Sequence, residues 1–424
     1  MMHSQNLERH FAGTSGLTLF PVGNAWHGVS VGTVRDSRPG EVSDETVEAL
    51  LAEVARLMPL ESVAALTLFV PEAGVTQRWL EQVAAAFPEE ATPALTCVAQ
   101  PVCEPDRIGF EAYGFPHKDV TFDRDRAKNL VQICHDGLTW VHGGQVTSLG
   151  PSAVYDGSSA MFHQAQERLV ATGSHFNQVV RTWLYLGDIV GRDGQTVRYH
   201  ELNRARSDFF EHDAHAVAPY PASTGIGQAG TDITMNFLSL TADRDGMFRN
   251  VALENPLQTS AFDYEAKYGR KSPKFSRAMA TVFDRQTILW VSGTASITDS
   301  ETRHQGDVAA QTNQTLENIR ALISSENLAR HGLEKKGSEK KGSDTFCRNG
   351  PKGASHKRCL TPFSLPFSLV SVRVYVKNRA DYPVVRSLCE ARLGQIPTIY
   401  VIADVCRNDL LVEIEAIGYC WEMM

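Results

Sequence analysis

The stretch "IPTIYVIADVCRNDLLVEIEAIG" (residues 396–418) decides the fold, because its pattern occurs three times in the chain. It contains a short apolar strand, a turn rich in Asp and Asn, and a second strand with alternating character. The same order is found in "TPALTCVAQPVCEPDRIGFEAYG" (92–114) and "PASTGIGQAGTDITMNFLSL" (221–240). Such a recurrence indicates a repeated module.

Two helix-like segments flanking a strand precede each of these stretches. In the first copy they are "SDETVEALLAEVARLM" (43–58), where Ser43 can cap the helix, and "VTQRWLEQVAAAF" (75–87). The order helix, strand, helix, strand, strand recurs three times, and a leading hairpin precedes the last two copies. The sequence therefore predicts an α+β fold of three modules in one chain, with sheets covered by helices.

The repeats divide the chain into three predicted domains. These are a diverged N-terminal domain (1–125), a central module (126–250) and a C-terminal catalytic module (251–424). Residues 334–368 interrupt the third module with the tandem duplications "EKKGSEKKGS" and "PFSLPFSL". Their composition predicts a disordered insertion without a catalytic role, and a phosphate- or partner-binding arm is the alternative.

The bulk composition indicates a small-molecule partner. A net charge of -8 over 424 residues argues against nucleic-acid binding, which needs a concentrated basic surface. No apolar run reaches the roughly 18 residues of a membrane helix, so we expect a cytoplasmic protein without membrane contact. The eight cysteines contain no CxxC pair, which suggests reduced thiols rather than a disulfide framework or a structural metal.

The last strand of the third copy raises a chemical question. Side chains alternate across a strand, so Glu413 and Glu415 point to the same face. Aligning the three copies places Gly109 and Asn236 at the position of Glu413, which is therefore acidic in one copy only. Two interpretations remain open at this stage: a polar outer face of an edge strand, or a carboxyl group that does chemistry.

Other segments offer candidate site residues. Residues 255–278 form a long irregular segment rich in Tyr, Lys and Arg that could cover a site for an anionic ligand, or be a solvated connector. The stretch "SGTAS" (292–296) has small side chains that allow a ligand or another backbone to come close, or is a tight turn. Cys406 lies across a turn from Glu413, although a lone buried thiol is more often structural. Arg181 lies within a strand pattern, where an inward guanidinium would need an anion and an outward one would be ordinary surface.

Several of these motifs resemble known families. "DVAAQTNQTLENIRALI" (307–323) and "LVEIEAIG" (411–418) resemble Rid (YjgF-like) proteins, which are trimers with active sites in the clefts between subunits. "NPLQTSAFDYEAKYGRKSPKFSRA" (255–278), "LWVSGTASI" (289–297) and "ADVCRNDLLVEIEAI" (403–417) resemble the chorismatase and 3-hydroxybenzoate synthase family, in which one chain contains the Rid-like modules. The resemblance implies three Rid/YjgF-like modules that form a pseudo-trimer, and therefore a monomer.

The resemblance also implies a reaction on chorismate. Cleavage of its enol ether begins with protonation of the enolpyruvyl methylene carbon, a role that falls on Glu413, while Glu415 is structural. In the family two positions choose the product, and here they are Gly293 and Cys406. This pair resembles the branch that forms 3-hydroxybenzoate and pyruvate, whereas the hydrolytic branch has Ala and Val.

The remaining site residues follow from the same resemblance. Arg277 and Tyr264 are expected to bind the substrate carboxylates, Arg181 is a weaker candidate, and Ala295 is expected to line the substrate site. No metal and no organic cofactor is expected.

Three alternatives stay open. The first is a chorismatase that hydrolyses chorismate to a dihydroxycyclohexadiene carboxylate and pyruvate. The second is a Rid-type enamine or imine deaminase, although those proteins carry an Arg after the Pro that begins the penultimate strand, and Thr398 follows Pro397 here. The third is a small-molecule binding protein without catalytic activity, against which the presence of Glu413, Cys406 and Arg277 together argues.

Overall fold

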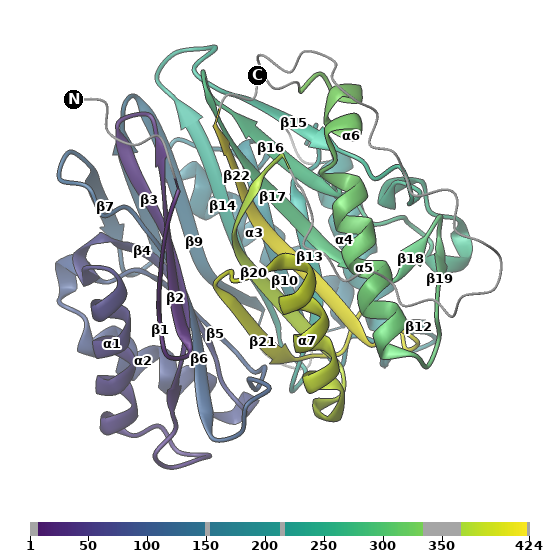
Figure 1. Cartoon of the computed structure of the whole chain (residues 1–424), viewed down its shortest axis with the longest axis horizontal. Helices are drawn as coiled ribbons and strands as arrows, with labels where there is room; N and C mark the ends of the chain where they lie inside the picture. Colours follow the sequence, from purple (N-terminus) through teal and green to yellow (C-terminus); the bar gives the residue numbers. More distant parts are fainter. Residues whose placement is uncertain (1–6, 149–152, 213–216, 334–365, 422–424) are drawn as a thin grey trace.

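Three six-stranded sheets with the same strand order dominate the computed structural model, which describes residues 7–148, 153–212, 217–333 and 366–421 (Figure 1). In each sheet the first three strands are antiparallel neighbours. The last strand of the unit then inserts next to the third, and a parallel pair completes the far edge.

The first sheet has the order β1-β2-β3-β6-β4-β5. Its strands are β1 (Glu8–Ala12), β2 (Ser15–Val22), β3 (Ala25–Arg35), β4 (Val63–Phe69), β5 (Ala94–Val98) and β6 (Arg107–Gly114). Its helices are α1 (Asp44–Leu57) and α2 (Thr76–Ala86). Ser43 caps α1 as predicted, because its side chain accepts a hydrogen bond from the backbone N–H of Thr46.

The second sheet has the order β7-β8-β9-β14-β10-β13. Its strands are β7 (Thr121–Asp125), β8 (Leu130–His135), β9 (Leu138–Ser148), β10 (Val179–Gly187), β13 (Ala222–Gln228) and β14 (Ile233–Ala242). Its helices are α3 (Val154–Val170) and α4 (Arg198–His212), and the short strands β11 (Arg192–Asp193) and β12 (Thr196–Val197) form a separate hairpin before α4.

The third sheet has the order β15-β16-β17-β22-β20-β21. Its strands are β15 (Arg249–Leu253), β16 (Ala278–Val282), β17 (Gln286–Ala295), β20 (Ser368–Val376), β21 (Thr398–Ile402) and β22 (Val412–Trp421). Its helices are α5 (Val308–Leu322), α6 (Ser325–Arg330) and α7 (Tyr382–Leu393), and β18 (Ile297–Thr298) pairs with β19 (Glu301–Thr302).

Helices cover one face of each sheet, and the opposite faces of the three sheets meet at the centre (Figure 1). The parallel pairs require this arrangement, since a parallel neighbour can be reached only through a crossover, here through α2, α4 or α7. The central core contains Trp140 and Trp290 from the second and third sheets and Phe20 from the first. Burial of both sheet faces explains why so many strand residues are apolar.

The sheets contact one another in a cyclic order. Strands β4 and β5 contact β8 and β9, strands β10 and β13 contact β16 and β17, and strands β20 and β21 contact β3. Each sheet therefore presents its parallel edge to the antiparallel strands of the next. The clefts between sheets arise at these three junctions.

The predicted α+β class and the threefold repeat of strands and helices are confirmed. One detail was wrong: a hairpin, β2 and β3, precedes the first copy as well as the last two. Its sequence contains Pro21 and several glycines, which weaken a strand pattern.

Two predicted boundaries can be compared with these elements. Strand β7 lies within the predicted first domain (1–125), yet it pairs with β8 in the second sheet. Most of the predicted insertion (334–368) lies outside the described residues, and Ser368 already begins β20. No helix in the described part of the chain has the length and apolarity needed to cross a membrane.

Candidate active site

A cavity lies at the junction of the second and third sheets and contains most of the predicted site residues. It contains about 670 Å³ of empty space, counting the open solvent at its mouth. Six of the seven predicted residues line it: Glu413, Cys406, Gly293, Arg277, Tyr264 and Ala295. Arg181 is not among its lining residues.

Glu413 supplies the acidic group of the cavity. It lies in β22 opposite Tyr375 of β20 and Ala295 of β17, and is only 4% exposed. Burial, and then the nearby carboxylate of Glu415, raise the pKa of Glu413 to about 8, although Arg181 and Arg277 oppose this shift. The carboxyl group therefore keeps its proton at neutral pH and can act as a general acid.

Gly293 leaves the space that the Glu413 carboxyl group occupies. A Cβ atom at this position would lie 1.9 Å from Oε1 of Glu413, far inside van der Waals contact. Gly293 sits at an irregularity of the β17–β22 pairing, between Val291 and Thr294, and its backbone N–H donates to Oγ1 of Thr224 at 2.9 Å. The second sheet thus fixes the backbone that faces the acid.

Glu415 lies two residues further along the same face and is held as a carboxylate. Its Oε2 accepts hydrogen bonds from Arg181 Nη2 at 2.9 Å and Tyr375 Oη at 3.1 Å, and its Oε1 accepts one from Trp183 Nε1 at 2.8 Å. Arg373 Nη1 lies 3.4 Å from Oε1. Burial alone would raise the pKa of Glu415, but the two guanidinium groups and the donors outweigh it and lower the pKa.

The prediction that an inward Arg181 needs an anion matches this contact. Arg181 is 2% exposed, and its Nη2 also donates to Oγ1 of Thr224 at 2.6 Å. Its Nη2 is committed to Glu415 and Thr224, its Nη1 is buried without a hydrogen bond, and Arg181 does not line the cavity. The structure therefore does not bring Arg181 to the cavity as a substrate ligand.

Arg277 and Tyr264 form the cationic wall of the cavity. Arg277 Nη2 donates to Oη of Tyr264 at 2.7 Å and to the carbonyl oxygen of Thr259 at 2.8 Å. Its Nε is buried and makes no hydrogen bond. The irregular segment before β16 carries both residues, together with the lining residues Tyr268 and Phe275.

Cys406 contributes a neutral thiol. Burial, and then the proximity of Glu413, raise the pKa of Cys406 to about 12. A thiol that stays protonated is a poor nucleophile. Its contribution to the cavity is therefore shape and polarity rather than covalent catalysis.

Sequence reasoning missed three residues that line the cavity: Tyr199, His200 and Arg407. Tyr199 and His200 belong to the first turn of α4, and no pattern in the sequence singled them out. Arg407 follows Cys406 directly, and its Cζ lies 4.1 Å from the ring centroid of Tyr268. Its position in the same turn as Cys406 could have indicated it.

One group of three potential metal ligands occurs among the residues that the structure describes: Asp208, Glu211 and His212. Both carboxylates form ion pairs with Lys271, at 2.5 and 2.6 Å. None of the three lines the cavity.

Comparisons with known proteins bear on the family of this chain. The family described as "Chorismatase FkbO/Hyg5-like, N-terminal" matches residues 124–239. A 3-hydroxybenzoate synthase of Streptomyces hygroscopicus is 33% identical over 328 residues, which is 72% of this chain and 86% of the relative. A chorismatase of Streptomyces rapamycinicus is 33% identical over 296 residues, covering 67% of this chain and 77% of the relative.

A crystal structure of a chorismatase has the same fold. It superimposes with a TM-score of 0.65 at 23% identity, covering 92% of this chain and 98% of that one. The chain belongs to the chorismatase family, as its motifs predicted, and it is an enzyme.

Proposed function

We propose that this enzyme converts chorismate into 3-hydroxybenzoate and pyruvate, with Glu413 as the general acid. The observation that carries the proposal is a buried carboxyl group, protonated at neutral pH, in a cavity that also holds Arg277 and Arg407. Chorismate is a dicarboxylate with an enol ether, so it needs both a proton donor and cationic groups. The relative named 3-hydroxybenzoate synthase supports the choice of product.

The reaction starts at the enolpyruvyl methylene carbon. Glu413 transfers its proton to that carbon, which leaves an oxocarbenium centre and a Glu413 carboxylate. The 4-hydroxyl oxygen then bonds to ring carbon 3 as the ether bond at that carbon breaks and pyruvate leaves, and the hydroxyl proton returns to Glu413. The resulting arene oxide opens at its bond to carbon 4, and the oxygen stays on carbon 3. Carbon 3 then loses its hydrogen as a proton while the oxygen gains one, which makes the ring aromatic and gives 3-hydroxybenzoate.

The other cavity residues bind and shape the substrate. Arg277 and Tyr264 hold a substrate carboxylate. Ala295 lines the cavity beside Gly293, and both leave room for the substrate ring and the acid. The thiol of Cys406 disfavours capture of the cation by water and so favours the intramolecular route.

We also propose that the three sheets are Rid-like modules arranged as a pseudo-trimer. Their common strand order and cyclic contacts support this arrangement. One chain then supplies all three clefts, so we expect a monomer in the cytoplasm. Light scattering on a sizing column would give a mass of 46.7 kDa for the monomer, and a larger mass would contradict it.

Hydrolysis of chorismate is the second candidate. Two of the relatives are named chorismatase, without a stated product. Hydrolysis would use the same first step and differ only in the capture of the oxocarbenium centre by water.

Incubation of the protein with chorismate, followed by liquid chromatography with mass detection, tests the proposal. We expect 3-hydroxybenzoate and pyruvate in equal amounts. Cys406→Val should raise the fraction of the dihydroxycyclohexadiene product. A dihydroxy product from the unmodified protein would favour hydrolysis, and survival of chorismate would refute both candidates.

A further inference from the structure

We propose that Glu415 is a positioning residue for the reaction: a fixed negative charge that holds the proton on Glu413. This inference rests on the proposed role of Glu413 as the acid. It assigns a chemical task to a carboxylate that does not line the cavity and that a purely structural interpretation would treat as an ion-pair partner.

The contacts of Glu415 keep it ionised. Two guanidinium groups, an indole N–H and a phenol O–H surround its two oxygens, so a proton there would replace charge-assisted hydrogen bonds. The side chains of Glu415 and Arg181 are only 7% and 2% exposed, so solvent and salt screen this charge weakly. A second carboxyl group close by must then take up a proton more readily.

The repeats argue that the fold does not require this charge. The residue equivalent to Glu415 in β14 is Leu238, which faces Arg181 in the same way that Glu415 faces Arg373. The second sheet therefore tolerates an apolar side chain at this position. In the first sheet the carboxylate of Glu111 occupies this position and pairs with Arg373, so the charge also occurs where no acid lies two residues away.

Several other groups bear on the proton of Glu413, and they come from every element around it. The cations Arg181, from β10, and Arg277, from the segment before β16, disfavour the protonated form. The neutral groups that face it are Tyr375 of β20, Cys406 of the last turn and Tyr199 of α4. Glu415 is the acidic group whose charge offsets the two cations.

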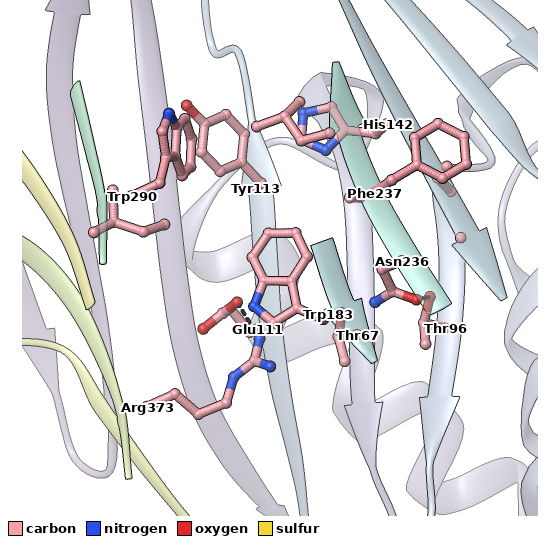
Figure 2. A pocket seen from close by; sticks show the side chains of 16 residues that line it. Thr67, Thr96, Glu111, Tyr113, His142, Trp183, Asn236, Phe237, Trp290 and Arg373 are labelled. Atoms are coloured by element: carbon pink, nitrogen blue, oxygen red, sulfur yellow. Dashed lines mark hydrogen bonds and ion pairs between the residues drawn. The ribbon is translucent and has the colours of Figure 1, made fainter. Parts of the chain in front are cut away.

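The network extends to the first sheet. Arg373 Nη2 contacts Oε1 of Glu111 at 2.5 Å, and Figure 2 shows this pair beside Trp183 on the wall of a second pocket. Because Arg373 also pairs with Glu111, it neutralises the negative charge of Glu415 less completely. Its loss should act in the same direction as loss of Glu415, with a smaller effect because Glu111 is more distant along the chain of contacts.

The test is the pH at which Glu413 loses its proton in Glu415→Gln. Infrared difference spectra report the protonated carboxyl group directly, and its band is identified by its absence in Glu413→Gln. In parallel, the fall of kcat/KM for chorismate at alkaline pH reports the same group. We expect both transitions to move to lower pH by at least about one unit in Glu415→Gln, because the cations remain while the carboxylate is gone.

Tyr375→Phe is the matched control, since it removes a hydrogen bond to Glu415 without changing any charge. Its transition should stay within about 0.3 pH units of the unmodified protein. If Glu415→Gln does not fold, Glu111→Gln is measured instead, with a smaller shift in the same direction expected. An unshifted transition in a folded charge variant would overturn the inference, whereas absence of chorismate turnover with a shifted infrared band would refute the proposed function alone.

Discussion

Two junctions between sheets each contain an ion pair between an Arg and a Glu, but only one of them contains the acid Glu413. Arg181 of the second sheet pairs with Glu415 of the third, and Arg373 of the third sheet pairs with Glu111 of the first. The side chains of Arg181, Glu415 and Arg373 are almost inaccessible to solvent, whereas that of Glu111 is 15% exposed. Since only one junction forms the site with the acid, the ion pair by itself does not define an active site.

The difference lies two residues before each glutamate. At the second junction the equivalent of Glu413 is Gly109, which faces Phe69 as Glu413 faces Tyr375. A Cβ atom at Gly109 would lie 2.5 Å from Val102 and 2.8 Å from Ile399. Apolar side chains fill the space that the carboxyl group and cavity occupy at the catalytic junction.

The largest effect is expected from removal of the acid. Glu413→Gln keeps the shape of the side chain but cannot protonate carbon, so turnover of chorismate should fall by at least about 100-fold. The matched control is Glu104→Gln, which places the same change at the cleft between the third and first sheets. Its turnover should remain within about twofold, and equal losses in both variants would contradict the distinction between the junctions.

The second largest effect is expected from removal of the Arg277 cation, which we propose binds a substrate carboxylate. Arg277→Gln removes a charge-assisted contact of about 1.5–3 kcal/mol with a substrate carboxylate, so kcat/KM should fall by roughly 10- to 100-fold, mainly through KM. Arg386 lies at the other cleft, and Arg386→Gln should leave both constants nearly unchanged. A normal KM in Arg277→Gln would exclude Arg277 from substrate binding.

A pair of glycine substitutions sharpens the comparison. Gly293→Ala displaces the flexible end of Glu413, so we expect about a tenfold loss of kcat, the cost of a misplaced acid, with little loss of stability. Gly109→Ala forces apart Val102 and Ile399 and should lower the free energy of unfolding by about 1–3 kcal/mol, while folded protein keeps its activity. Urea unfolding together with steady-state kinetics distinguishes these outcomes, and an exchanged pattern would contradict the assignment.

The last effect is a pH dependence of stability. Because the folded-state pKa of Glu413 is about 8 against 4.5 for an ordinary Glu, its stabilising contribution is complete below about pH 4.5 and is lost as the pH rises to about 8. Glu413→Gln has no carboxyl group at this position to titrate. The difference in free energy of unfolding, variant minus unmodified protein, should therefore rise by about 1.4 kcal/mol per pH unit between about pH 4.5 and pH 8. Urea titrations at pH 5, 6, 7 and 8 would measure it, and a constant difference would show that the carboxyl group titrates normally.

The repeat, the α+β class and the motifs around Glu413 could be predicted because strand alternation and turn residues are local signals. The first hairpin was missed because Pro21 and the glycines of β2 and β3 hide the alternation, and pairing within the sheet overrides that weak propensity. For Arg181 the sequence left open whether the side chain points inward, and its partner, Glu415, could not be found because it is 234 residues away in the chain. Tyr199 and His200 reach the cavity only through the packing of α4, which no local pattern encodes.

The cyclic contact of three similar sheets within one polypeptide has a consequence for how such a site can change. In an assembly of identical subunits, every substitution appears at all three junctions, so a costly acid cannot be confined to one of them. Here the three equivalent positions hold Gly109, Asn236 and Glu413, and each has its own surroundings. Because the three sheets belong to one chain, a substitution appears at one junction only. Two junctions can therefore be selected for stable packing while the third is selected for catalysis.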